Sequence, residues 1–212
     1  MKDVIVLFGK PGAGKGTRLS EFLDGREEQY EVLAVSALLK KARAEKTEIG
    51  KEVASYMDTG KLVPNEIINK MVVQAIKDAE KNIIIDGFPR TCVQAEAMLE
   101  AGISPNIVIE FYVEDEVVLE RARDRIVCEK CGEPYTTNEF KRPKQEGICD
   151  KCLGKLIKRK DDEESVVRKR LEIYQEETYP VLKIFEENNV KISTIISNGG
   201  NALKQLEELL IK

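Results

Sequence analysis

Short apolar runs alternate along the chain with longer segments of helical periodicity. Continuous apolar runs at residues 4–8, 83–85 and 107–112 predict strands that are buried on both faces. Weaker runs at 32–35 and 192–196 predict two more strands. Alternating strands and helices are typical of a parallel sheet covered by helices on both faces. The pattern therefore predicts an α/β fold with a sheet of about five strands.

The segments between these runs repeat their apolar residues at helical spacing. The helices that this spacing predicts cover residues 15–28, 49–58, 66–80, 91–100, 115–127, 163–177 and 202–210. No apolar run approaches the roughly 20 residues that a membrane-spanning helix needs. The N-terminus also lacks the pattern of a signal peptide, so we expect a cytoplasmic protein without a membrane partner.

Two stretches interrupt the alternation. Residues 128–160 hold four of the five cysteines and few large apolar residues, and residues 36–63 contain two helical patterns with no strand between them. Both stretches are therefore expected to be insertions into one core. The predicted division is a core of residues 1–34, 65–126 and 161–212, a first insertion at 35–64 and a second insertion at 127–160.

Composition narrows the chemistry. The chain has no histidine, which excludes catalytic triads, imidazole acid–base chemistry and histidine metal sites. Its 34 lysines and arginines face 38 acidic residues, a net charge of -4, so nothing in the charge balance predicts a nucleic-acid partner. Any catalysis must use lysine, arginine, carboxylates and backbone groups.

A glycine-rich segment, GKPGAGKGT at residues 9–17, follows the first predicted strand and begins the first predicted helix. Glycines there let backbone N–H groups converge on an anion, the helix N-terminus adds positive charge, and Lys15 can reach the phosphates. An ordinary glycine-rich turn is the alternative, which the strand–loop–helix context disfavours. Gly16 stands where the strict motif has Ser or Thr, with Thr17 next, so a hydroxyl ligand for Mg²⁺ is not assured.

Asp86 ends a predicted strand at the sheet edge where open α/β folds bind ligands. We expect it to meet Mg²⁺ through water. A capping or turn aspartate before Gly87 is the alternative.

Four cysteines form two CxxC pairs separated by 17 residues: Cys128, Cys131, Cys149 and Cys152. Four thiolates would complete a tetrahedral Zn²⁺ shell and leave no position for substrate, so the predicted site is structural. Two disulfides or an iron centre are the alternatives. Five basic and five acidic residues lie between the first and last cysteine, which argues against a nucleic-acid zinc ribbon.

Arginines flank the cysteine-rich insertion. Arg121 and Arg125 are four residues apart on the predicted helix that enters it, Arg159 lies at its exit, and Arg170 lies on the next predicted helix. Solvated helix charges are the ordinary interpretation. Opposite a phosphate loop, however, guanidinium groups would stabilise the charge of a phosphoryl-transfer transition state. A phosphate acceptor is already ionised and would need no general base.

Nearly the whole chain resembles the adenylate kinase family. The phosphate loop, IGKEVASYMDTGKLVPNE, IIIDGFPRTCVQAEAM, the paired CxxC segment and RKDDEESVVRKRL occur in the family's order and spacing. The resemblance implies a P-loop three-layer fold with a five-stranded parallel sheet, an inserted helical segment that binds the nucleoside monophosphate (NMP), and a long, zinc-stapled lid. The lid would close over the donor and exclude water.

The resemblance also implies roles for individual residues. The implied catalytic residues are Lys15, Arg90, Arg125, Arg159 and Arg170. The implied ATP contacts are Gly12, Ala13, Gly14, Lys15, Gly16, Thr17, Arg121, Arg125 and Tyr135. The implied AMP contacts are Ser36, Lys40, Lys61, Leu62, Val63, Gly87, Arg90, Gln94, Arg159 and Arg170. Asp161 and Asp162 match the lid-hinge aspartates.

One segment departs from the family pattern. Where the family usually has STGDxLR or a close variant, this chain reads AVSALLK at residues 34–40, so the aspartate is missing and Lys40 stands for the arginine. Lysine keeps the charge but loses the bidentate fork, so we expect weaker acceptor affinity.

The sequence thus predicts a monomeric nucleoside monophosphate kinase that converts Mg·ATP and AMP reversibly into two ADP, with one structural Zn²⁺ per chain. A kinase for another monophosphate, UMP or CMP, is one alternative. A non-catalytic zinc-ribbon protein that binds nucleotides is the other. Arg90, Arg125, Arg159 and Arg170 together argue against the second alternative, because mere binding needs no transition-state clamp.

Overall fold

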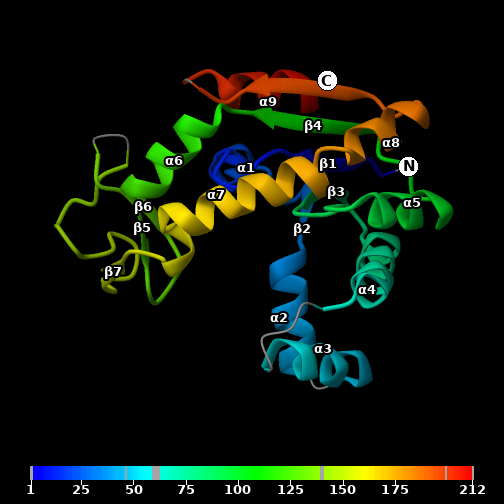
Figure 1. Cartoon of the computed structure of the whole chain (residues 1–212), viewed down its shortest axis with the longest axis horizontal. Coiled ribbons are helices and arrows are strands. Elements are labelled where there is room, and N and C mark those ends of the chain that lie inside the picture. The colour runs from blue at the N-terminus through cyan, green and yellow to red at the C-terminus, as the bar shows by residue number, and fades with distance from the viewer. Residues whose placement is uncertain (1, 46, 59–62, 139–140, 199, 212) are drawn as a thin grey trace.

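The computed structural model describes residues 2–45, 47–58, 63–138, 141–198 and 200–211. A parallel five-stranded sheet forms its centre, in the order β2-β3-β1-β4-β8 (Figure 1). Its strands are β1 (Val4–Phe8), β2 (Tyr30–Ala34), β3 (Asn82–Asp86), β4 (Ile107–Tyr112) and β8 (Ile192–Ile196). The predicted α/β class and five-stranded parallel sheet are confirmed. Val35, predicted to end β2, instead begins a helix.

Helices cover both faces of this sheet and complete three layers. One face packs on α4 (Asn65–Asp78), α5 (Cys92–Glu100) and α8 (Val181–Glu187). The other packs on α1 (Lys15–Leu23), α6 (Asp115–Asp124), α7 (Glu164–Ile173) and α9 (Ala202–Leu210). All five residues of β1 are buried, because Val4, Val6 and Phe8 face one layer while Ile5 and Leu7 face the other. Such burial explains the continuous apolar runs.

Parallel pairing brings the carboxyl ends of the strands to one edge. Leu7 of β1 is in register with Asp86 of β3, and Phe8 with Glu110 of β4. The glycine-rich loop leaves β1 at this edge, and Gly87 and Ser197 follow β3 and β8 at the same edge. The topology therefore gathers the phosphate loop and the DGFPRT segment.

Two helices follow β2 and stand clear of the sheet: α2 (Val35–Glu45) and α3 (Glu48–Asp58) (Figure 1). A Cβ atom at Gly50 would lie 2.1 Å from the carbonyl oxygen of Ala42, so glycine permits the close crossing of these helices. The two helices and α4 share a small core of their own: Ala42, Val53, Ile67 and Met71. The prediction of two successive helical segments here is confirmed.

The cysteine-rich insertion forms a second, three-stranded antiparallel sheet, β6-β5-β7. Its strands are β5 (Arg125–Cys128), β6 (Pro134–Thr136) and β7 (Leu156–Ile157). The predicted helix over 115–127 is wrong at its end, because α6 stops at Asp124 and the β-branched pair Ile126 and Val127 enters the ladder with β6. Arg121 and Arg125 therefore do not share a helix face. We call residues 125–162, between α6 and α7, the lid.

Two further helical boundaries differ from the predictions. Helix α1 ends at Leu23, short of residue 28, and Gly25 then takes a φ of +75°, outside the helical region. The predicted helix over 163–177 is α-helical only to Ile173 and continues as a single π turn, η2 (Tyr174–Thr178). The short α8 was not predicted. Throughout the described part of the chain, each helix is too short or too polar for a bilayer crossing.

Candidate active site

The phosphate loop joins β1 to α1 in a backbone conformation that glycine favours. Gly9, Gly12 and Gly14 have φ angles of +132°, +83° and +88°, and Gly14 is the N-cap of α1. A Cβ atom at Gly9 would lie 2.5 Å from the carbonyl oxygen of Phe111. The sequence thus places a glycine-shaped loop directly at a helix N-terminus, an arrangement that suits an anion.

Lys15 begins α1, and its side chain returns to the start of the loop. Its Nζ donates hydrogen bonds to the carbonyl oxygens of Gly9 (2.6 Å) and Lys10 (3.1 Å). Burial lowers the pKa of Lys15 to about 8, the charge of Asp86 opposes this shift, and those of Arg90 and Arg170 reinforce it. Charged side chains from β3, the loop after β3 and α7 therefore lie close enough to Lys15 of α1 to influence its charge.

Two residues donate hydrogen bonds to backbone carbonyl groups of the phosphate loop. The buried Ser197 donates its hydroxyl to the carbonyl oxygen of Ala13 (2.6 Å). Arg121 donates to the carbonyl oxygens of Gly12 (3.3 Å) and Ser197. Ser197 was not predicted; its only sequence signal is its position directly after a strand. The implied contact of Arg121 with ATP stays a prediction.

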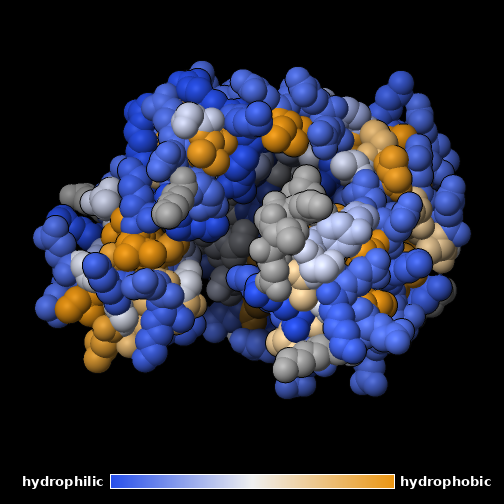
Figure 2. Space-filling view, turned by 60° about the horizontal axis from the view of Figure 1, so that its bottom comes forward, coloured by the Kyte–Doolittle hydropathy of each residue, from blue (hydrophilic) through white to orange (hydrophobic). Residues whose placement is uncertain are grey.

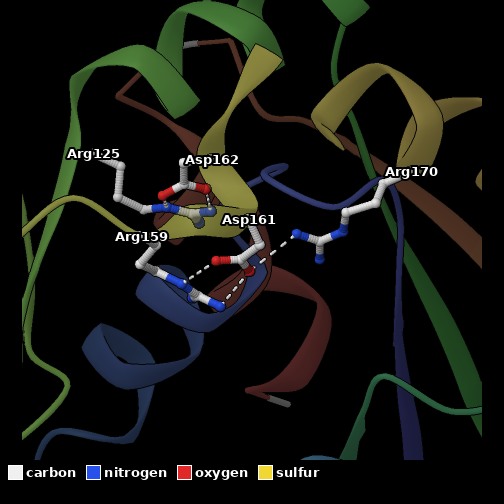
Figure 3. Close-up of polar contacts among 5 residues, drawn as sticks. All are labelled: Arg125, Arg159, Asp161, Asp162 and Arg170. Carbon is white, nitrogen blue, oxygen red and sulfur yellow. Dashed lines mark hydrogen bonds and ion pairs between the residues drawn. The ribbon is translucent and has the colours of Figure 1, made fainter. Parts of the chain in front are cut away.

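Three arginines at the base of the lid meet two aspartates (Figure 3). Arg125 donates to both carboxylate oxygens of Asp162, with 2.8 Å between Nε and Oδ2, and the Asp162 side chain has 0% exposure. Asp161 lies between Arg159 and Arg170, with 2.8 Å to Arg159 Nε and 3.4 Å to Arg170 Nη1. The two aspartates hold the three guanidinium groups in one place.

The electrostatics of Arg170 show how closely the cations gather. Burial lowers the pKa of Arg170, Asp161 opposes that shift, and the charges of Arg125, Arg159 and Arg90 reinforce it. Four arginines from different segments therefore act on one another, with Lys15 beside them. Figure 2 shows the surface hollowed between the lid and the rest of the molecule. Such a cationic site suits a ligand with several phosphate charges.

Arg90 follows β3 and the cis peptide Phe88–Pro89. Its Nε donates to the carbonyl oxygen of Gly87 (2.8 Å), and its backbone N–H donates to Gln94 Oε1 (2.7 Å). Gln94 is buried and donates its Nε2 to Asn65 Oδ1 (2.8 Å), so both ends of its amide are bound within the protein. The AMP contacts implied for Gly87, Arg90 and Gln94 stay predictions.

The other implied AMP contacts belong to the α2–α3 segment. Ser36 and Lys40 are exposed on α2 and lie four residues apart, on one face of the helix. Val63 is half-buried and packs against the small core of this segment. Lys61 and Leu62 lie outside the described residues.

The four cysteines of the two CxxC pairs converge in the lid. All four Sγ atoms lie within 4.8 Å of one another, with 3.4 Å between Cys128 and Cys152 and 3.6 Å between Cys131 and Cys149. A disulfide would need about 2.05 Å, whereas a tetrahedral metal bound at about 2.3 Å separates its sulfur ligands by roughly 3.8 Å. The structure therefore shows a metal-site geometry and not two disulfides.

Backbone groups near the sulfur atoms favour the ionised form of two of these cysteines. Burial raises the pKa of the Cys128 and Cys149 thiols, but hydrogen bonding outweighs it: backbone groups at Lys130 and Cys131 lower the pKa of Cys128, and those at Lys151 and Cys152 help to lower that of Cys149 to about 6. Such hydrogen bonds favour the thiolates that a metal requires.

Tyr135 is buried beside the sulfurs. Its hydroxyl accepts from the backbone N–H of Asp150 (2.8 Å) and lies 3.5 Å from Cys149 Sγ. The structure thus places Tyr135 in the small core of the lid, and the ATP contact that the resemblance implies for it stays a prediction.

Comparison with known proteins agrees with this geometry. The sequence model of a family described as adenylate kinase matches residues 7–190. Relatives named adenylate kinase include those of Staphylococcus aureus (40% identical over 192 residues, 88% of each chain) and Clostridium tetani (38% over 197 residues, 89% of each). A third, from Caldicellulosiruptor saccharolyticus, is 36% identical over 199 residues, 90% of each chain. With its phosphate loop, clustered arginines and four-cysteine lid, the chain belongs to the adenylate kinase family.

Proposed function

We propose that this enzyme transfers the γ-phosphoryl group of ATP reversibly to AMP, forming two ADP. The observation that carries the proposal is the convergence of Lys15, Arg90, Arg125, Arg159 and Arg170 at one edge of the sheet. These residues come from five segments, and solvated surface charges have no reason to gather in this way. Family membership supports the same reaction.

The mechanism follows from where the cations lie. The phosphate loop and the N-terminus of α1 bind the donor phosphates, and Lys15 contacts the group that is transferred. Arg90 binds the acceptor phosphate, whose attacking oxygen is already ionised, so no side chain need remove a proton. Arg125, Arg159 and Arg170 stabilise the charge that spreads over the equatorial oxygens. Because Asp161 already holds Arg159 and Arg170 together, their guanidinium groups need little ordering when phosphate replaces that carboxylate.

Asp86 is the residue that we propose to position Mg²⁺. Its carboxylate ends β3 beside Lys15, and carboxylate oxygens are ligands that Mg²⁺ prefers. Gly16 offers no hydroxyl, so water and phosphate oxygens would complete the shell. When bound, the ion neutralises charge on the donor phosphates. Asp86→Asn should therefore lower activity at limiting Mg²⁺ and recover part of it at high Mg²⁺.

For the lid we propose one structural Zn²⁺ per chain, held by Cys128, Cys131, Cys149 and Cys152. The four-sulfur geometry supports this choice, and a filled thiolate shell has no position for a nucleotide. The thiol ligands also support a reducing compartment, for which we propose the cytoplasm. Elemental analysis should find about one zinc per chain; iron in its place would refute the assignment.

We further propose that two insertions move against the core: residues 35–64, the acceptor-binding segment, and residues 127–160, which make up most of the lid and are called the lid segment. The lid segment has a small hydrophobic core of its own, which supports its movement as a unit, and the acceptor-binding segment shares its small core with α4 of the core division. Closure would bring the lid arginines onto the donor and exclude water. We propose that the protein acts as a monomer, since each chain contains the complete set of site residues.

The decisive experiment is a coupled assay with ATP and each of AMP, CMP, UMP and GMP. AMP should be the preferred acceptor, and clear turnover of another monophosphate without turnover of AMP would overturn the proposal. The alternative acceptors UMP and CMP are considered because Lys40, on the exposed face of α2, stands where the family usually has arginine. Lysine lacks the bidentate fork of arginine, so AMP should be bound less tightly. Lys40→Arg should therefore lower the KM for AMP, with Lys41→Arg on the same helix as the control.

A further inference from the structure

We propose that Thr178 is a positioning residue for Arg90 and, through it, for the acceptor phosphate; this inference rests on the proposed function. Thr178 lies in the π turn η2, 88 residues from Arg90 in sequence. Its Oγ1 donates a hydrogen bond of 2.8 Å to the carbonyl oxygen of Arg90. Nothing in the sequence pattern marks this threonine.

With this contact, both polar groups of the Arg90 backbone are hydrogen-bonded to side chains. On one side, the N–H of Arg90 donates to Gln94 Oε1 of α5 (2.7 Å). On the other side, its carbonyl oxygen accepts from Thr178. The Arg90 side chain is exposed, and among the described residues its one hydrogen bond is to the carbonyl oxygen of Gly87. A fixed backbone is therefore what directs this long guanidinium group toward the acceptor site.

The π turn that carries Thr178 is anchored in the core. Its i to i+5 hydrogen bond runs from the N–H of Tyr179 to the carbonyl oxygen of Tyr174 (2.8 Å). The ring of Tyr174 is buried with its centroid 5.9 Å from that of Phe8, the last residue before the phosphate loop. The turn is thus anchored in the core next to the donor site.

One continuous helical segment consequently sets three parts of the site. Arg170, Tyr174 and Thr178 follow one another at intervals of four residues along α7 and η2. They supply a phosphate-clamping arginine, a core anchor behind the phosphate loop, and the hydroxyl that holds Arg90. The geometry therefore couples the placement of Arg90 to that of Arg170 through a single element.

The test compares Thr178→Val, which keeps the shape but removes the donor, with Thr178→Ser, which keeps the donor. Steady-state kinetics would give kcat and the KM for AMP and for ATP, and thermal melting would follow folding. Loss of one such hydrogen bond should raise the KM for AMP roughly 3- to 10-fold in Thr178→Val. The KM for ATP should change by less than about twofold, and Thr178→Ser should restore the KM for AMP. Glu177→Gln, an exposed change in the same turn, is the matched control.

Each outcome separates positioning from packing. An unchanged KM for AMP in Thr178→Val would overturn the inference and leave the proposed function intact. Equal rises in both KM values, or a defect that Thr178→Ser fails to restore, would show a structural role and overturn it too. A wild-type protein that cannot phosphorylate AMP would instead refute the proposed function, and this inference with it.

Discussion

Lys15→Met removes a positive charge that destabilises the folded protein. Burial lowers the pKa of Lys15 from 10.5 to about 8. Between these two values the unfolded chain binds a proton that the native protein has released. Stability of the wild type therefore rises relative to that of Lys15→Met as the pH increases through this window, because methionine does not titrate.

The size of the effect follows from the same shift. At about 1.36 kcal/mol per pKa unit, the gap between the two values corresponds to a free energy on the order of 3 kcal/mol. Below pH 8 the wild type lacks this contribution. Above pH 10.5 it has the whole of it, so the difference in unfolding free energy between the two proteins should move by that amount in favour of the wild type.

Urea unfolding measured between pH 7 and pH 10.5 would test the prediction. Far-ultraviolet circular dichroism is the suitable signal, because the chain has no tryptophan. Lys70→Met, on the exposed side of α4, controls for the loss of one lysine charge. A wild-type minus Lys15→Met difference that stays constant within about 0.5 kcal/mol would refute the reasoning. Lys15→Met should also lose turnover at pH 7 while remaining folded.

Three further predictions concern the lid and the arginine cluster. Cys128→Ser should lower the melting temperature and the zinc content but leave measurable turnover at low temperature, and unchanged zinc content would contradict the ligand assignment. Leu153→Gly should stabilise the lid by about 1 kcal/mol, because Leu153 has a left-handed φ of +58° and its side chain is 80% exposed. A lower melting temperature in this variant would show that contacts of the leucine side chain outweigh the backbone strain. Arg170→Lys should lower kcat by roughly tenfold or more with little change in melting temperature, and near-normal kcat would remove Arg170 from the clamp.

The sequence predicts the central sheet well because its signal is local. Val4–Phe8 is apolar at every position, and the structure buries every position between two helical layers. The end of α6 was harder to predict, because 115–127 keeps helical spacing past Asp124. What ends the helix is the pairing of Ile126 and Val127 with β6 and of Val127 with Ile157 in the more distant β7, interactions that periodicity does not record.

The site divides in the same way. The phosphate loop and the CxxC pairs were predictable because each motif holds its functional groups within a few neighbouring residues. Ser197, Thr178 and the pairing of Arg125 with Asp162 involve side chains that folding brings together from distant positions. The serine and the threonine carry no local signature, and the resemblance marked Asp162 as a lid-hinge residue without giving its partner.

The ion pair of Arg125 and Asp162 joins the two ends of the lid (Figure 3). Arg125 immediately follows α6, and Asp162 ends the 3₁₀ turn Lys160–Asp162 that leads to α7. The lid therefore has its two ends held together and a hydrophobic core of its own. A unit of this kind could be exchanged between homologous enzymes. Changing the length of a flexible insert between fixed ends costs only about 0.6 kcal/mol per doubling. A graft that preserves this one ion pair should therefore accept a shorter, metal-free lid without disturbing the parallel sheet.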